Sequence, residues 1–269
     1  MLKNRIIASV IVDNTKVVQT ESFEFKHYIH YDALFAIKSF FDWSIDELVL
    51  INISRKEEKY HEFLDIIERT SEIARLPISV GGWINTVERG EEVIRLGAEK
   101  LIINSSFYEN PEIPKTLSNE FGKQCIVASI DYKVNKNGET EVYIDKGRKN
   151  IGESLYSWAE KCINNGAGEL YVTNMEFEGK RNGYDISNLS KLVKKVKVPV
   201  IFFGGAMEWE HFGEGLKAGA SAVAAANIFH YKELASIKLR NYLLANEFNV
   251  RKIYLIFINP LDSSFSKRR

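Results

Sequence analysis

Asp131 is the residue of this chain whose position best suits acid–base chemistry. It follows the largely apolar run 125–130, which places a carboxylate at the end of a buried strand. Partial burial there would raise the pKa of the carboxyl group and allow it to donate a proton. A capping or loop-bonding aspartate is the alternative interpretation. A near-copy of the segment favours catalysis, because Ala128-Ser129-Ile130-Asp131 resembles Ala8-Ser9-Val10-Ile11.

The position that matches Asp131 in the first copy is Ile11, and this mismatch bears on the chemistry. Carboxylates at both matched positions would supply an acid and a base. Isoleucine can neither accept nor donate a proton, so that symmetrical mechanism is absent. Asp13 lies two residues later on the same strand face and is the candidate for a displaced base. A loop aspartate before Asn14 is the alternative.

Two glycine pairs and nearby polar residues predict anion binding. Gly81-Gly82 and Gly204-Gly205 follow apolar runs, and their missing side chains let backbone N–H groups approach an anion. One pair in each half fits a long ligand with an anionic group at each end. Tight turns are the alternative, and Trp83 must narrow the first site or stack on the ligand. The candidate phosphate- or substrate-binding residues are Gly81, Gly82, Asn104, Ser105, Thr173, Glu178, Gly179, Gly204, Gly205, Ala226 and Asn227.

Two further groups of charged residues have both a functional and a structural interpretation. In the polar segment 174–185, Glu178 and Lys180 could bind substrate, although a charged loop is usually only solvated. At the starts of four apolar runs stand Arg5, Glu47, Lys100 and Glu169. Two positive and two negative charges at one end of a barrel would form a neutral ring. From the residues alone, that ring is most simply a structural plug.

The elements that must position these residues alternate regularly along the chain. Eight apolar runs predict buried strands at 5–12, 47–53, 77–81, 100–104, 124–131, 169–174, 199–204 and 221–226. Helical patterns lie between and after them at 31–42, 58–75, 87–96, 111–121, 153–165, 186–197, 208–218 and 231–246. Strict alternation predicts parallel strands joined by crossover helices.

The internal repeat selects a closed barrel among such folds. Four segments recur in the same order at a nearly constant spacing, so two similar halves make up the chain. We therefore predict a single (β/α)8 TIM barrel over 1–250, with half-barrels at about 1–122 and 123–250. The connection 14–30 is long enough to be an active-site lid. The tail 251–269 has an apolar stretch too short to span a bilayer and could dock on the barrel or a partner.

Composition narrows the classes of partner and compartment. The 269 residues carry 36 Lys+Arg and 36 Asp+Glu, so the chain has no net charge and nothing suggests nucleic acid or a membrane surface. Cys125 and Cys162 form neither a metal-ligand spacing nor a disulfide framework, which favours the cytoplasm. We expect no metal and no cofactor.

These residues and motifs resemble those of a known family. From Met1 to about Arg251, the chain is similar to the cyclase subunit of imidazole glycerol phosphate synthase, the HisF family. The matching segments are Arg5-Ile6-Ile7, Asp46-Glu47-Leu48-Val49, Val80-Gly81-Gly82, Gly97-Ala98-Glu99-Lys100, Ile103-Asn104-Ser105, Ala128-Ser129-Ile130-Asp131, Gly166-Ala167-Gly168-Glu169, Gly183-Tyr184-Asp185, Gly204-Gly205-Ala206 and Ile228-Phe229-His230.

The resemblance implies a subunit that takes ammonia from a class I glutaminase (HisH-like) docked at the N-terminal face of the barrel. It also implies that Arg5, Glu47, Lys100 and Glu169 gate an ammonia tunnel. Family members use carboxylates matching position 11 and Asp131 to open the imine of a phosphoribulosyl substrate and close the imidazole. This chain departs from the family pattern at Ile11, Gln19, Asn52, Trp83 and Glu178.

Because the departures gather at one end while the gate residues are intact, we expect changed chemistry. The preferred interpretation is a divergent paralogue that supplies ammonia to a separate sugar amidotransferase, forming an acetamidino group for surface-polysaccharide synthesis. The alternative is the ordinary cyclase of histidine biosynthesis, with Asp13 or another group as base. A second alternative is a non-catalytic barrel that activates a glutaminase.

Overall fold

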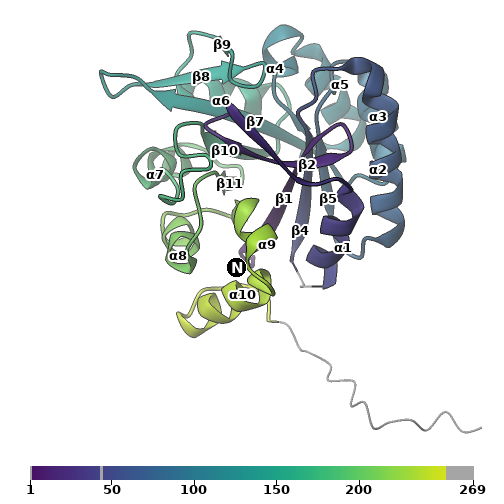
Figure 1. The fold of residues 1–269 in the computed structure, drawn as a ribbon. Helices are drawn as coiled ribbons and strands as arrows, with labels where there is room; N and C mark the ends of the chain where they lie inside the picture. The colour runs from purple at the N-terminus through teal and green to yellow at the C-terminus, as the bar shows by residue number, and fades with distance from the viewer. Residues whose placement is uncertain (1, 43–44, 253–269) are drawn as a thin grey trace, which may run out of the picture.

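The computed structural model describes residues 2–42 and 45–252 and shows a closed barrel of parallel strands surrounded by helices (Figure 1). The predicted (β/α)8 fold is thereby confirmed. The eight barrel strands are β1 (Arg5–Asp13), β4 (Glu47–Asn52), β5 (Ile78–Gly81), β6 (Lys100–Ile103), β7 (Ile126–Val134), β10 (Glu169–Asn174), β11 (Val200–Phe203) and β12 (Ala222–Ala225).

The strand order fixes which residues face one another. Neighbouring strands follow the order β1-β4-β5-β6-β7-β10-β11-β12, and β12 closes the ring on β1. Strand β7 is therefore the fourth neighbour of β1 in either direction and lies opposite it. Because all eight run parallel, their carboxyl ends form one mouth, and the residues ending β1 and β7 look across that mouth at each other.

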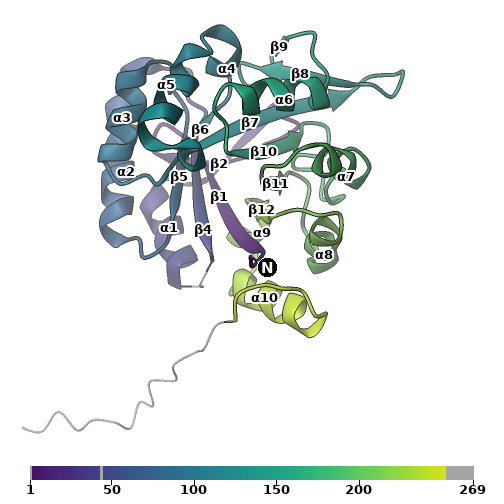
Figure 2. The same cartoon turned by 180° about the vertical axis from the view of Figure 1, so that it is seen from behind.

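The main helices form the outer layer, as Figures 1 and 2 show from opposite sides. These helices are α1 (Ala33–Asp42), α2 (Tyr60–Ile73), α3 (Val87–Arg95), α5 (Glu112–Phe121), α6 (Leu155–Asn164), α7 (Ile186–Lys195), α8 (Trp209–Lys217) and α10 (Ala235–Ala245). Each of the eight predicted helices is present within a few residues of its expected position. Local caps explain several starts, since Thr86, Ser154 and Asp185 accept hydrogen bonds from the first turns of α3, α6 and α7.

Two separate apolar layers hold the barrel together. Inside the barrel, inward side chains such as Ile7, Val49 and Ile102 form one cluster. Outside it, the alternate side chains, such as Ile6 and Leu48, pack under the helices in a larger cluster. Burial on both faces explains why the strands read as continuous apolar runs in the sequence.

The structure adds elements that the sequence did not predict. Segment 14–30, expected to be a loop, forms an antiparallel hairpin of β2 (Lys16–Glu21) and β3 (Phe25–His30) that extends β1. A second hairpin extends β7 and consists of β8 (Thr140–Ile144) and β9 (Lys149–Asn150). The remaining short elements are η1 (Glu57–Lys59), α4 (Ser106–Glu109), η2 (Lys123–Cys125) and α9 (Asn227–Tyr231).

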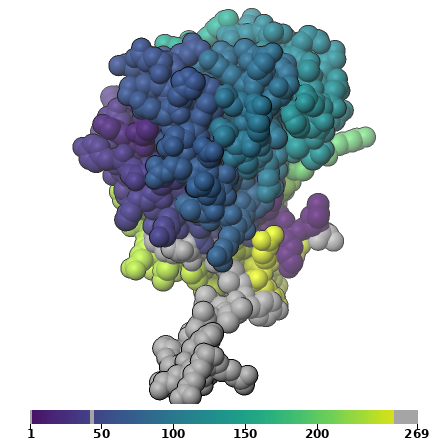
Figure 3. All heavy atoms as spheres, turned by 90° about the vertical axis from the view of Figure 1, so that its right-hand side faces the viewer, coloured from purple at the N-terminus to yellow at the C-terminus, as the bar shows by residue number. Residues whose placement is uncertain are grey.

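The two ends of the described chain meet at the N-terminal face. Asn4 N–H donates to the carbonyl of Asn249 at 2.8 Å, and Lys3 Nζ donates to the carbonyl of Val250. In Figure 3 the purple N-terminal residues accordingly lie beside yellow residues near the C-terminal end of the described chain, below the blue residues of the barrel wall. The predicted docking of the tail concerns mainly residues 253–269, which lie outside the described residues. Within the described ranges, no helix has the length and apolarity needed to cross a membrane.

Candidate functional site: a charged ring and an asymmetric barrel mouth

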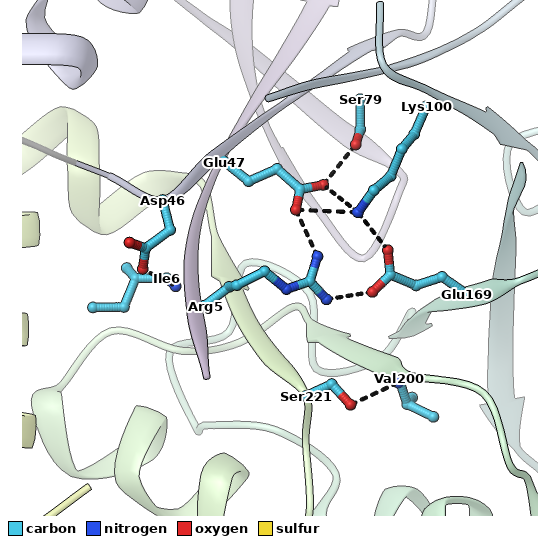
Figure 4. Close-up of polar contacts among 9 residues, drawn as sticks. All are labelled: Arg5, Ile6, Asp46, Glu47, Ser79, Lys100, Glu169, Val200 and Ser221. Carbon is cyan, nitrogen blue, oxygen red and sulfur yellow. Dashed lines mark hydrogen bonds and ion pairs between the residues drawn. The ribbon is translucent and has the colours of Figure 1, made fainter. Parts of the chain in front are cut away.

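The four charged residues at the strand starts form a closed ring inside the N-terminal end of the barrel (Figure 4). Arg5 donates to Glu47 at 2.6 Å and also to Glu169. Lys100 completes the ring with contacts of 3.2 Å to Glu47 and 2.7 Å to Glu169. Each cation therefore contacts both carboxylates, and the ring is neutral as predicted.

Ion pairs and a hydrogen bond keep the Glu47 carboxylate of the ring ionised in spite of its burial. Glu47 is 1% exposed and also accepts a 2.6 Å hydrogen bond from Ser79 Oγ on β5. Burial acts to raise the pKa of Glu47, but Lys100, Arg5 and Ser79 outweigh it and the pKa lies below its usual value. Next to the ring, the buried Asp46 accepts from Ile6 N–H and pairs with Arg240 of α10, which ties the C-terminal helix to the strand that carries Glu47.

At the opposite end, Asp131 is a buried carboxyl group with one polar partner among the described residues. Asn104 Nδ2 donates to it at 3.1 Å and also to the carbonyl of Ser129. Burial raises the pKa of Asp131 to about 7, against the opposing hydrogen bond from Asn104 and with a smaller contribution from the charge of Glu178. A carboxyl group with this pKa exchanges a proton readily near neutral pH, as the sequence interpretation required.

Across the mouth, Ile11 places an apolar side chain at the position that matches Asp131 in the internal repeat. Ile11 is 8% exposed and belongs to the cluster inside the barrel, so it points inward on β1 as Asp131 does on β7. The matched positions on these two opposite strands thus carry one inert side chain, Ile11, and one ionisable side chain, Asp131.

Asp13, the candidate displaced base, is held by the β2–β3 hairpin. Its carboxylate pairs with Lys26 and accepts a 3.1 Å hydrogen bond from the Tyr28 hydroxyl. Burial acts to raise the pKa of Asp13, but the contacts with Lys26 and Tyr28 outweigh it and the pKa lies below its usual value. A carboxylate stabilised in this way is a weak base, so these contacts favour an anchoring role for Asp13.

The second-half anion residues gather around one pocket between the ends of β10, β11 and β12. Six of the eleven predicted binding residues line it, namely Glu178, Gly179, Gly204, Gly205, Ala226 and Asn227. Thr173 adjoins them, because a side chain on Gly204 would meet its methyl group. The backbone at Gly205 also has a structural reason for glycine, since a Cβ there would lie 2.1 Å from the carbonyl oxygen of Gly183.

The first-half residues do not form an equivalent open site. The Ser105 hydroxyl accepts a hydrogen bond from Asp145 N–H in the turn between β8 and β9. Gly82 lies against Asn52, so that a Cβ at Gly82 would be 2.4 Å from the Asn52 carbonyl oxygen. Trp83 follows in a left-handed conformation with φ 61°. The β8–β9 turn therefore covers part of the region where the sequence predicted a symmetrical second anion site around Gly81, Gly82, Asn104 and Ser105.

Glu178 has a structural partner as well as a place in the pocket. Its carboxylate accepts hydrogen bonds from the Thr20 hydroxyl and from Phe23 N–H, at 2.9 and 3.3 Å. Burial raises the pKa of Glu178, and these hydrogen bonds oppose that rise. Glu178 thus fastens the β2–β3 hairpin to the loop after β10.

Three residues near the mouth were not singled out from the sequence. Arg181 lines the second-half pocket, although the charge-rich loop had drawn attention only to Glu178 and Lys180. Lys232 Nζ donates a hydrogen bond to the Met207 carbonyl. Lys146 Nζ donates to the Ser54 carbonyl, although the two residues are 92 positions apart in the sequence. No sequence signal connects such distant partners. Across the described ranges, no group of three His, Cys, Asp or Glu side chains could hold a metal ion.

Comparisons with known proteins agree with the architecture. A family model described as "Histidine biosynthesis protein" matches residues 5–235. "Imidazole glycerol phosphate synthase subunit HisF" of Exiguobacterium sibiricum is 38% identical over 252 residues, covering 93% of this chain and all of that protein. Proteins of the same name are 36% identical in Oceanobacillus iheyensis, covering 94% of this chain and 99% of that one, and 38% identical in Pyrococcus furiosus, covering 93% and 99%.

Proposed function

Since the chain belongs to the family of imidazole glycerol phosphate synthase subunit HisF, we propose that it is the barrel subunit of a glutamine amidotransferase. Its partner is a class I glutaminase of the HisH type, which docks at the N-terminal face of the barrel. Ammonia released there passes the charged ring and crosses the barrel to the mouth. A phosphorylated or sugar small molecule is the acceptor.

The observation that carries this proposal is the closed ring of Arg5, Glu47, Lys100 and Glu169. A buried ion-pair network is weak support for a purely stabilising role, because well-packed apolar residues stabilise such positions as well or better. A ring in which each cation bonds both carboxylates can exchange partners without leaving a charge unpaired. That property suits a gate that opens for a small polar molecule.

Coupling between the two subunits tests the gate. In the complex with the glutaminase, Lys100→Ala should lower the fraction of released ammonia that is incorporated, while glutamine hydrolysis continues. Lys115→Ala is the matched control, because Lys115 makes only an exposed pair with Glu112 on α5. An unchanged ratio of incorporated to released ammonia in Lys100→Ala would return the ring to a structural role.

For the reaction at the mouth, the names of the relatives favour ring closure on a phosphoribulosyl substrate in histidine biosynthesis. Asp131 is the proton-transferring residue in that reaction, because its pKa lies near neutrality. The second-half pocket, with Gly204, Gly205 and Asn227, would hold one phosphate of the substrate. The first-half residues Gly81, Gly82, Asn104 and Ser105 would lie towards the other end.

A second candidate reaction is favoured specifically by Ile11. A ring closure that uses two carboxylates lacks one of them here, and Asp13 is engaged by Lys26. Under this candidate the chain is a divergent paralogue that supplies ammonia to a separate sugar amidotransferase, which forms an acetamidino group for surface polysaccharide. Asp131 would then be needed less for catalysis than for shaping the mouth.

Turnover of the phosphoribulosyl substrate with ammonium salt separates the two candidates without the glutaminase. Loss of a general base typically costs about 10²- to 10⁴-fold in rate, so we expect ring closure to be slower by about this factor than in a HisF protein assayed beside it. Recovery of the rate in Ile11→Asp favours the first candidate, and a rate that stays at background in Ile11→Asp favours the second. A barrel that only activates a glutaminase would leave ammonium unconsumed with either class of acceptor.

A further inference from the structure

Inside the barrel, one side-chain contact reaches from the first half of the chain to the second. The hydroxyl oxygens of Ser9 on β1 and Tyr171 on β10 lie 2.9 Å apart, within hydrogen-bonding distance. Strand β10 is the third neighbour of β1, beyond β12 and β11, so the contact crosses the interior and does not join adjacent strands. The Tyr171 ring also stacks on Phe203 of β11. Tyr171 is therefore held both by its ring and by its hydroxyl group.

The Ser9–Tyr171 pair lies in a sealed layer between the two ends of the barrel. Ser9 is fully buried, and Tyr171 is 1% exposed. On the side of the charged ring, the side chains of Arg5 and Lys100 keep 26% and 19% of their exposure. On the side of the mouth, the inward-facing Ile51 at the end of β4 is partly exposed. Solvent thus reaches into the barrel from both ends but does not reach the pair.

The side chains around the pair are apolar. Ile7, Val49 and Ile201 belong to the cluster inside the barrel and are almost completely buried. A small polar molecule that crosses this layer loses its hydrogen bonds to water, which is costly. Two hydroxyl groups in the same layer supply a donor and an acceptor, and these offset part of that cost.

Tyr171 keeps its proton in this environment. Burial raises the pKa of Tyr171 well above its usual value, against the hydrogen bond with Ser9, and the nearby charge of Asp131 raises it further. A phenol that stays protonated donates a hydrogen bond without giving up the proton. A small base that binds to it therefore remains uncharged, as a molecule in an apolar layer must.

We propose that Ser9 and Tyr171 form a binding station for one molecule of uncharged ammonia, halfway between the charged ring and the mouth. The ammonia enters between the two hydroxyl groups, accepts a hydrogen bond from the Tyr171 O–H through its lone pair, and donates an N–H to Oγ of Ser9. The direct contact between the hydroxyl groups forms again when the molecule moves on. The choice of ammonia as the ligand rests on the proposed route through the barrel.

Carbon NMR of isotope-labelled tyrosine tests the station in the full chain. The chain has 12 tyrosines, and Tyr171→Phe identifies the Cζ resonance of Tyr171. Ammonium chloride is titrated at constant ionic strength, once at pH 7 and once at pH 9. We expect saturable movement of the Tyr171 resonance, with the midpoint at a lower total concentration at pH 9, because a larger share of the ammonium is uncharged there. An unmoved resonance, or equal midpoints at the two pH values, would overturn the proposal.

A variant and an internal control decide whether the hydroxyl pair is the cause. Ser9→Ala should raise the Kd read from the Tyr171 resonance by about five- to tenfold, as expected for loss of one hydrogen bond. Tyr132 is the matched control, because its buried hydroxyl donates to Asp185 at 2.8 Å but its side chain packs outside the strands, under the helices. Its resonance should not follow the titration. An unchanged Kd in Ser9→Ala, or equal responses of Tyr132 and Tyr171, would refute the station.

The complex with the glutaminase separates the station from the route. Tyr171→Phe should lower the fraction of released ammonia that is incorporated by about five- to tenfold, whereas Tyr132→Phe should leave that fraction unchanged. If Lys100→Ala lowers the fraction and Tyr171→Phe does not, the route stands and the station is refuted. If neither variant lowers it, the route itself fails, and the station fails with it.

Discussion

The hydroxyl of Tyr171 on β10 lies 2.9 Å from Oγ of Ser9 on β1, joining the two halves of the chain inside the barrel. Tyr171 also stacks on Phe203, with ring centres 5.1 Å apart. Because Tyr171 follows Glu169 by two residues on the same inward face, this contact lies directly above the charged ring. On the proposed route, ammonia that has passed the ring would meet the Ser9–Tyr171 pair next.

Removing this hydrogen bond should destabilise the barrel modestly. Tyr171→Phe keeps the ring stack but leaves the fully buried Ser9 hydroxyl without its partner, so we expect the free energy of unfolding to fall by about 1 to 2 kcal/mol. Ser9→Ala should cost a similar amount. Urea unfolding of both single variants and the double variant measures the coupling, which should be about 1 kcal/mol. Strictly additive single effects would mean that the two hydroxyls do not interact.

Asp131 should make stability fall as the pH rises towards neutrality. A carboxyl group whose pKa is raised from 3.8 to about 7 binds its proton more tightly in the folded state than in the unfolded state. The free energy of unfolding therefore falls with each unit by which the pH rises between these two values. Over about three pH units, the contribution reaches roughly 4 kcal/mol at most. Asp131→Asn should remove it, and the unfolding free energy of the variant relative to the parent should therefore increase between pH 5 and pH 8. Parallel pH profiles for the two proteins would refute the raised pKa.

Gly205 should tolerate a methyl group much less well than Gly138. Both have positive φ, at 91° and 81°, so each alanine pays a backbone cost of about 1 kcal/mol. Only at Gly205 would the added Cβ also clash with the backbone, because it would lie 2.1 Å from the carbonyl oxygen of Gly183. The space around a Cβ at Gly138 is open. We expect Gly205→Ala to lower the unfolding free energy by about 3 kcal/mol or more. Gly138→Ala should lower it by about 1 kcal/mol. Equal losses in urea unfolding would show that the Gly205–Gly183 contact relaxes easily.

The barrel could be predicted from the sequence because its signals are local and repeated. Strands buried on both faces give short apolar runs, and the copy of Ala8-Ser9-Val10-Ile11 at Ala128-Ser129-Ile130-Asp131 aligns the two halves. The hairpins could not be predicted in this way. Strand β3 is largely exposed, so Phe25–His30 carries no alternation between an apolar and a polar face.

The site was predicted only in part, for a related reason. The residue types that form the ring, the pocket and Asp131 follow recognisable runs at strand ends, where a barrel brings them together. The partners of Glu178, Ser105 and Lys146 are set by how the two hairpins fold back over the mouth. Those contacts join residues far apart in sequence, such as Thr20 with Glu178 and Lys146 with Ser54. Sequence spacing has no bearing on them.

We infer that the mouth keeps one carboxylate of an acid–base pair, Asp131, and lacks the other because Ile11 stands at the matched position. The most direct measurement is turnover of the phosphoribulosyl substrate with ammonium salt by the parent chain and by Ile11→Asp, with Ile11→Asn as the uncharged control. We predict that the parent is slow and that Ile11→Asp, but not Ile11→Asn, raises its rate by about 10²-fold or more, since a positioned general base typically contributes that much. A parent chain as fast as a HisF protein assayed beside it, with no gain from Ile11→Asp, would contradict the claim.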